Sequence, residues 1–176
     1  MLRAMPDDLA RRLLSASELH GDFVLSSGKR SSVYFDKFRF LTDPDLLRET
    51  AHAVADLLPA DIGVLAAPEG AATLLVAAAS LETGLPIVVV RKEPKAYGTR
   101  SQIEGPLPQG AAVALIEDVS TTGRQVLRAA RVLEDADRTI GVIVLAIDRG
   151  GGERLRDEGY HVRSIVEVGA DDRVGG

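Results

Sequence analysis

The strongest constraint on the fold is a series of short apolar segments that alternate with segments of helical periodicity. Ile87–Val90 is β-branched throughout, and Ala111–Ile116 and Thr139–Ile147 are apolar at nearly every position. A strand with apolar side chains on both faces has to lie inside a sheet that is covered on both sides. Because helical segments separate these strands, we expect an α/β fold with a mostly parallel sheet and helices on both faces.

Two further strands are predicted at Ile62–Ala67 and His161–Val168, which gives five strands in all. Capping residues mark where helices start and stop, because Asp43 precedes a proline and Gly84 follows a helical stretch. The helices are expected at Pro6–Ala16, from Pro44 to about Leu58, and at Ala71–Glu82, Gln125–Glu134 and Glu153–Glu158.

The N-terminal part has a different character, with short aromatic segments that are typical of strands. These predicted strands are Asp22–Leu25 and Val33–Phe40, and the residues between them, Ser26–Lys29, are expected to form a turn. The whole chain has 176 residues, which fits a single domain with a sizeable core.

Composition excludes several classes of function. The chain has no cysteine, so it forms neither a disulfide nor a thiolate metal site, and His20, His52 and His161 match no short metal-ligand spacing. The formal net charge of −5 argues against nucleic acid as a partner. The first residues lack the apolar core of a secretory signal, and no apolar run reaches the roughly 20 residues that cross a bilayer. A cytoplasmic protein is therefore the expectation.

The segment after the predicted strand Ala111–Ile116 has the residues of a phosphate-binding loop. The apolar strand that ends at Ile116 leads into Glu117 and Asp118, then into hydroxyl side chains and Gly123, and then into a helix. Small residues at a helix N-terminus let backbone N–H groups converge on a phosphate, while carboxylates accept hydrogen bonds from sugar hydroxyls. The simpler alternative is that Thr122 only caps the helix, but the combination favours a site for ribose 5-phosphate.

A basic segment follows the predicted strand Ile87–Val90. Arg91, Lys92 and Lys95 lie within five residues, in a chain that is acidic overall. The loop is long and contains glycines, which is typical of a mobile lid. Cations in such a loop would stabilise the negative charge of a departing pyrophosphate. The simpler alternative is an ordinary solvated loop.

Residues 113–125 resemble the phosphoribosyl pyrophosphate (PRPP) motif of the type I phosphoribosyltransferases. That resemblance implies that the two acids contact the ribose hydroxyls and that the following residues hold the 5-phosphate. It assigns to PRPP the residues Glu117, Asp118, Val119, Ser120, Thr121, Thr122, Gly123, Arg124 and Gln125.

The segment that starts at Arg91 resembles the catalytic loop of the orotate phosphoribosyltransferases. The resemblance implies that Arg91, Lys92 and Lys95 contact the PRPP phosphates and act in catalysis together with Asp118. Tyr97, which also belongs to the implied PRPP site, stands where many family members have histidine. The family further implies a homodimer in which the loop 91–105 completes the neighbour's site, and Mg²⁺ that is carried mainly by PRPP rather than by protein ligands.

Orotate as the base is implied by two more resemblances to that family. Tyr34 and Phe35 correspond to aromatic residues of an N-terminal hood that border the pyrimidine. Arg149 stands at the strand end where the family has an arginine that contacts orotate, and Thr121 is implied as a further contact. Because adjacent strand residues point to opposite faces, one of the two aromatics is expected in core packing. The implied fold is the type I phosphoribosyltransferase fold, with a hood over about residues 1–40 and a core over about 41–168.

One departure from the family lies in the turn after Ile62–Ala67, where Ala71 and Ala72 stand in place of commoner glycines. Alanine tolerates a positive φ poorly, so we expect a shifted turn or weaker contacts with pyrophosphate. Two alternatives to orotidine 5-phosphate synthesis stay open, and this turn supports only the second of them. They are a phosphoribosyltransferase for another base and a PRPP-sensing regulator that retains the fold.

Overall fold

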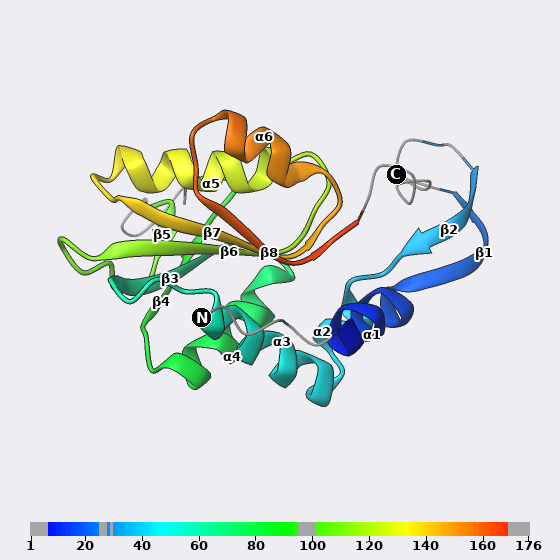
Figure 1. The fold of residues 1–176 in the computed structure, drawn as a ribbon. Coiled ribbons are helices and arrows are strands. Elements are labelled where there is room, and N and C mark those ends of the chain that lie inside the picture. Colours follow the sequence, from blue (N-terminus) through cyan, green and yellow to red (C-terminus); the bar gives the residue numbers. More distant parts are fainter. Residues whose placement is uncertain (1–6, 25–27, 29, 95–100, 169–176) are drawn as a thin grey trace.

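The computed structural model describes residues 7–24, 28, 30–94 and 101–168, and these form a central sheet flanked by helices (Figure 1). In this described part the sheet has six strands in the order β5-β4-β3-β6-β7-β8. Five of them run parallel, as predicted, whereas β5 pairs antiparallel with β4 and was not predicted, because two residues leave no pattern in a sequence. The strands are β3 (Ile62–Pro68), β4 (Ile87–Val90), β5 (Ile103–Glu104), β6 (Ala112–Ser120), β7 (Ile140–Asp148) and β8 (Val162–Glu167).

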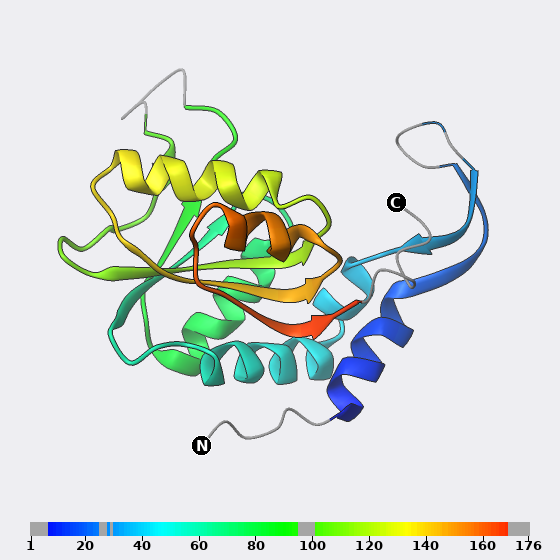
Figure 2. The same cartoon turned by 45° about the horizontal axis from the view of Figure 1, so that its top comes forward.

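Helices cover both faces of this sheet, α3 and α4 on one side and α5 and α6 on the other (Figures 1 and 2). Adjacent residues of β3 show the result, since Leu65 packs in the cluster with α3 and α4 while Val64 packs in the cluster with α5 and α6. Burying a side chain of this size contributes roughly 1.5–3 kcal/mol, so both faces stabilise the sheet. The helices are α3 (Pro44–Asp56), α4 (Ala72–Thr83), α5 (Arg124–Asp135) and α6 (Gly151–Asp157).

The predicted helix caps are confirmed. Asp43 Oδ1 accepts the N–H groups of Asp45 and Leu46 at 3.0 and 2.9 Å, which satisfies two amides that lack a partner within α3. At the C-terminal end of α4, Gly84 adopts the left-handed conformation with φ of 73° and ends the helix.

The N-terminal region forms a separate two-stranded hairpin beside the main sheet (Figure 1). The predicted strand Val33–Phe40 is wrong in its second half, because the segment from Phe38 onward is a short helix. Asp36 redirects the chain there: its Oδ1 accepts the Phe38 N–H at 3.0 Å. Of the predicted turn at Ser26–Lys29, Gly28 alone lies within the described residues. The elements are α1 (Asp7–Ser17), β1 (Glu18–Val24), β2 (Arg30–Phe35) and α2 (Phe38–Leu41).

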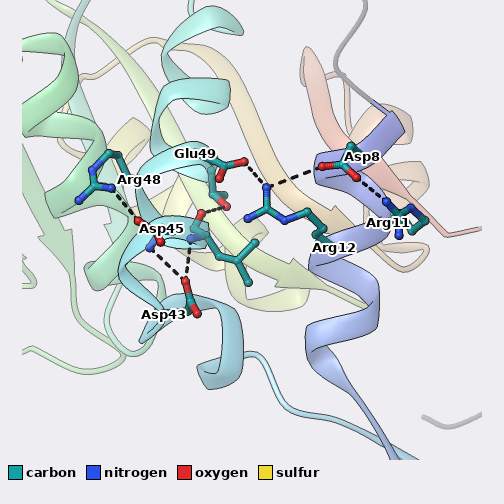
Figure 3. A network of polar contacts seen from close by, with 9 residues as sticks. Asp8, Arg11, Arg12, Asp43, Asp45, Arg48 and Glu49 are labelled. Atoms are coloured by element: carbon teal, nitrogen blue, oxygen red, sulfur yellow. Dashed lines mark hydrogen bonds and ion pairs between the residues drawn. The ribbon is translucent and has the colours of Figure 1, made fainter.

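Helix α1 is fastened to α3 by apolar and polar contacts. Leu9 and Leu13 are buried in the core cluster that includes α3. On the surface, Arg12 donates to Glu49 at 2.6 Å and lies within 3.8 Å of Asp8, as Figure 3 shows. Exposed ion pairs of this kind contribute at most about 1 kcal/mol each, so the leucines carry most of the attachment.

Within the described ranges, none of the helices combines the length and the apolar character that spanning a membrane requires.

Candidate active site at the carboxyl ends of the parallel strands

The predicted acid pair lies inside β6 rather than after it. The strand was expected to end at Ile116, but its pairing with β7 continues to Ser120, which lies opposite Asp148. As a result, Glu117 is 3% exposed and Asp118 is 0% exposed. The two carboxylates are therefore held by a strand ladder and not by a solvated loop, which corrects the predicted boundary of this strand.

Asp118 has one satisfied and one unsatisfied oxygen. Its Oδ1 accepts the Val119 N–H at 2.6 Å and the ammonium of Lys37 at 3.1 Å. Its Oδ2 is buried and has no hydrogen-bond partner. A buried acceptor without a partner costs about 1–3 kcal/mol, and such atoms in native proteins generally await a ligand, water or ion.

Glu117 has an unusual protonation equilibrium for a carboxylic acid. Burial, followed by the charge of Asp118, raises the pKa of Glu117 from 4.5 to about 8, although the nearby Lys37 acts in the opposite direction. Near neutral pH the pair therefore favours one proton, because two buried carboxylates side by side repel each other. Perturbed acids of this kind are typical of functional sites.

The segment between β6 and α5 forms a cavity of about 210 Å³, which we call the loop cavity. Its wall consists of the predicted phosphate residues, the carboxylate of Glu117 and the side chain of Lys37. Gly123 adopts φ of 68° directly before α5, which lets the chain turn its amides toward the helix start. The predicted residues that line the loop cavity are Glu117, Val119, Ser120, Thr121, Thr122, Gly123, Arg124 and Gln125.

The loop packs main chain to main chain against the start of α6. A Cβ atom on Gly123 would lie 2.7 Å from the carbonyl oxygen of Gly151, which is closer than real Cβ atoms come. The Arg149 N–H donates to the carbonyl of Ser120 at 2.8 Å across the same contact. Asp148 caps α6 by accepting the amides of Gly150 and Gly152, both at 2.9 Å. Glycine is thus required on both sides of this contact.

The turn between β3 and α4 differs from the expectation. Its positive φ, 131°, falls on Gly70, whereas Ala71 has an ordinary helical φ of −65°. The predicted strain at Ala71 is therefore wrong, because glycine is present at the position that needs it. With this correction, the turn no longer favours a catalytically weak regulator over an enzyme.

The start of the basic loop lies beside that turn. Glu69 accepts the backbone N–H of Lys92 at 2.9 Å, and a guanidinium N–H of Arg128 donates to the Lys92 carbonyl. Together with Arg91 and Arg124, these cations line a second cavity of about 290 Å³, which we call the cationic cavity. The structure therefore brings Arg91 and Lys92 next to the first turns of α5. Lys95 and Tyr97 lie outside the described residues.

The residues predicted for the base fall into two groups. The guanidinium carbon of Arg149 lies 4.7 Å from the centre of the Phe35 ring, so the hood and the core meet here. Burial lowers the pKa of Arg149, and the charge of Glu18 acts in the opposite direction. Tyr34 instead stacks on Phe23, with ring centres 5.5 Å apart, and does not join this pair. Thr121 is exposed at the loop cavity.

Sequence reasoning missed Lys37. It belongs to no motif and follows the hood strand β2, 81 positions before its partner Asp118. A basic residue at the end of an aromatic strand carries no signal of its own, so only the folded chain reveals the contact.

The parallel sheet, the buried acid pair and the glycine-containing loop before α5 together define the type I phosphoribosyltransferase class. The chain is 42% identical over 173 residues to the orotate phosphoribosyltransferase of Thermococcus gammatolerans, covering 96% of this chain and 92% of that protein. It is 44% identical over 149 residues to that of Methanocella arvoryzae, covering 84% and 85%. The chain belongs to the orotate phosphoribosyltransferase family.

Solved structures agree with this assignment. The orotate phosphoribosyltransferase of Mycobacterium tuberculosis H37Rv superimposes with a TM-score of 0.82 at 27% identity, covering 94% of this chain and 97% of that one. The enzyme of Aeropyrum pernix gives a TM-score of 0.77 at 33% identity, with 91% and 93% covered. A scan against family models finds no match.

Proposed function

We propose that this protein transfers the ribose 5-phosphate of PRPP to orotate and releases orotidine 5-phosphate and pyrophosphate, a step of pyrimidine biosynthesis. The observation that carries the proposal is the loop cavity, where the buried Glu117–Asp118 pair meets a glycine-containing helix start. Carboxylates and helix-start amides are the groups that a sugar hydroxyl and a phosphate need, respectively.

In the proposed reaction a ring nitrogen of orotate bonds to carbon 1 of the ribose while the bond from that carbon to pyrophosphate breaks. The nitrogen gives up its proton, which the departing pyrophosphate takes up. The electron pair leaves with the pyrophosphate oxygen, and positive charge develops on the ribose. The acid pair binds the ribose hydroxyls and lies near that positive charge, whereas Arg91, Lys92 and Lys95 neutralise the leaving group. No protein nucleophile takes part.

Mg²⁺ fits the cationic cavity only as a complex with pyrophosphate. Four cations line that cavity, Arg91, Lys92, Arg124 and Arg128, and the amide of Gln125 is the one side-chain oxygen ligand in the part of its lining that the structure describes. The lining therefore suits phosphate oxygens and not a bare cation. When bound, the metal would offset part of the charge on pyrophosphate. In the described residues, no three histidine, aspartate or glutamate side chains gather into a site of their own.

We assign orotate to the place where the hood meets the core. Arg149 provides two parallel N–H donors for a carboxylate, and Phe35 supports its guanidinium from the side. Thr121 would add a contact from the loop cavity. A structure of the Mycobacterium tuberculosis relative in complex with PRPP supports the use of that donor in the family.

A homodimer is part of the proposal, with the loop 91–105 of one subunit completing the site of the other. Leu74 and Leu81 support it, because they lie two helical turns apart on α4 and are 40% and 90% exposed. Large exposed apolar side chains on one helix face are typical of a protein contact. A cytoplasmic location stays a prediction, which cell fractionation would check.

Pyrophosphate release that requires both PRPP and orotate tests the proposed reaction. The wild-type protein should turn over orotate at least about 100-fold better than uracil, adenine or xanthine, because the half-buried Arg149 loses a charge-assisted contact when the base has no carboxylate. Preference for one of the other bases would contradict the assignment.

Arg149→Ala tests the orotate site directly. Removing the guanidinium should raise the orotate KM by about tenfold or more and leave the PRPP KM within about threefold, since a charge-assisted pair contributes roughly 1.5–3 kcal/mol. The matched control is Arg163→Ala, because Arg163 donates to the Leu57 carbonyl at 2.6 Å and belongs to neither cavity. Equal KM values in wild type and Arg149→Ala would remove Arg149 from the base site.

A further inference from the structure

Lys37 connects the hood to the wall of the loop cavity. It lies directly before α2, where the chain leaves the hood, yet its side chain reaches β6 of the core. It lines the loop cavity opposite the hydroxyl residues Thr121 and Thr122. Lys37 is therefore in place to contact whatever this cavity binds.

The charge inside the loop cavity makes such a cation favourable for a phosphate ligand. The hydroxyls and backbone amides of the loop are neutral, and the α5 N-terminus adds only about half a positive charge. Glu117 faces the same cavity and Asp118 lies beneath it, so the acid pair opposes the binding of an anion. Within the described ranges, Lys37 and Arg124 are the cations that line this cavity.

The geometry of Lys37 leaves donors for a ligand. An ammonium group has three N–H donors, and one is directed at Asp118 Oδ1 at 3.1 Å. The Lys37 side chain is 36% exposed, whereas that of Asp118 is 0% exposed. The ion pair thus holds the ammonium in the cavity wall, and within the described residues its other two donors have no hydrogen-bond partner.

We infer that Lys37 binds the 5-phosphate of the substrate directly, as a cation that the hood supplies to the phosphate loop. Its contact with Asp118 holds the ammonium in place before the phosphate arrives. The inference rests on the proposed function, because it requires the loop cavity to receive a sugar phosphate. It assigns the hood a part in PRPP binding as well as in base recognition.

Calorimetric binding of inorganic phosphate and of ribose 5-phosphate to Lys37→Met tests this assignment. The methionine keeps the length of the side chain and removes its charge, so both ligands should bind about tenfold more weakly or worse. Arg39→Met is the matched control, because Arg39 is an exposed cation on the short helix that directly follows Lys37 and does not line the cavity. Equal phosphate affinity in the two variants would overturn the inference.

Repeating the Lys37→Met substitution in the Asp118→Asn variant separates direct phosphate binding by Lys37 from an effect through Asp118. If Lys37 touches the phosphate itself, Lys37→Met should also weaken inorganic phosphate binding by about tenfold when Asp118 is replaced by asparagine. If the loss disappears in Asp118→Asn, Lys37 acts only by holding the acid, and the direct contact is wrong. Thermal unfolding of each variant, with Lys37→Gln as a second substitution, shows that the comparison is made between folded proteins.

A failure of the Lys37 inference can be distinguished from a failure of the proposed function. A wild type that consumes orotate and PRPP, with a Lys37→Met variant that binds phosphate normally, would refute the role of Lys37 alone. A wild type that binds phosphate through Lys37 but never releases pyrophosphate with orotate would refute the proposed reaction and keep the phosphate contact.

Discussion

The loop cavity and the cationic cavity flank the start of α5 and share Arg124 and Gln125, but they are built from different material. The loop cavity is formed by main chain, hydroxyls and buried carboxylates within a strand ladder. The cationic cavity is formed by long side chains such as Lys92 and Arg128, which attach to their surroundings through backbone contacts. The start of α5 therefore borders one cavity that contains a buried acid and a second cavity that is lined, among the described residues, by cations and no acid.

This difference matches what the proposed reaction demands of each end of PRPP. The sugar has to be held in one orientation, so fixed backbone and buried acceptors suit it. The pyrophosphate gains charge and then departs, so long cations that follow it suit the other end. The contrast predicts that substitutions in the loop cavity affect binding of the sugar, whereas those in the basic loop affect the chemical step.

The largest effect is expected from Asp118→Asn. The amide keeps the shape of the side chain but loses the negative charge near the ribose, so kcat/KM for PRPP should fall by about 100-fold to 1,000-fold. Steady-state kinetics with PRPP as the varied substrate measures this. Asp61→Asn is the control, because Asp61 is exposed and lies outside both cavities. An activity loss below about threefold would show that the acid pair is not part of the sugar site.

Lys95→Ala should produce the next largest effect, and this effect should concern the pyrophosphate end of PRPP. Removing this cation should lower kcat by about 100-fold while the orotate KM changes little, because the lost interaction belongs to the transition state. If the loop crosses the dimer, mixing equal amounts of Lys95→Ala and Asp118→Asn should restore about a quarter of the wild-type activity, since half of the dimers then contain one intact site. Verified mixed dimers without any recovery would show that each subunit uses its own loop.

The smallest effect concerns the pH dependence of the free energy of unfolding, and it should arise from Glu117 in the loop cavity. The pKa of Glu117 is raised to about 8 from 4.5. A carboxyl group with a higher pKa in the folded state keeps its proton after the unfolded chain has lost it, so the free energy of unfolding falls as the pH rises from 4.5 to about 8. Glu117→Gln should flatten this slope. Urea unfolding at about pH 5 and about pH 8 measures it, and parallel slopes in both proteins would contradict the raised pKa.

Much of the core could be predicted from the sequence because its signals are local. Ile87–Val90 is apolar on both faces, Gly84 provides the left-handed helix end, and Asp43 caps α3, and each of these is where it was expected. The errors have equally physical causes. Alternating aromatics in Val33–Phe40 mimic a strand, but Asp36 turns the chain into a helix whose Phe40 is 0% exposed.

The candidate site could be predicted in part for the same reason. The acid pair and the loop 120–125 are contiguous, so their chemistry can be read from neighbouring residues. The burial of Asp118 and its contact with Lys37 depend on segments far apart in the chain, and no periodicity indicates them. The conformation of the turn at Gly70 likewise depends on how β3 meets α4. Comparison with the glycine-rich turn of the family suggested a strain at Ala71 that does not exist.

The close approach of Gly123 to Gly151 has a consequence for how this enzyme family can change. The loop that we propose binds the sugar phosphate and the segment that carries Arg149 contact each other main chain to main chain, so this contact would fix the distance between the two proposed binding sites. Side chains outside the contact can change without disturbing it. A single methyl group at either glycine would spread this contact and move the two proposed sites apart, whatever the surrounding residues are.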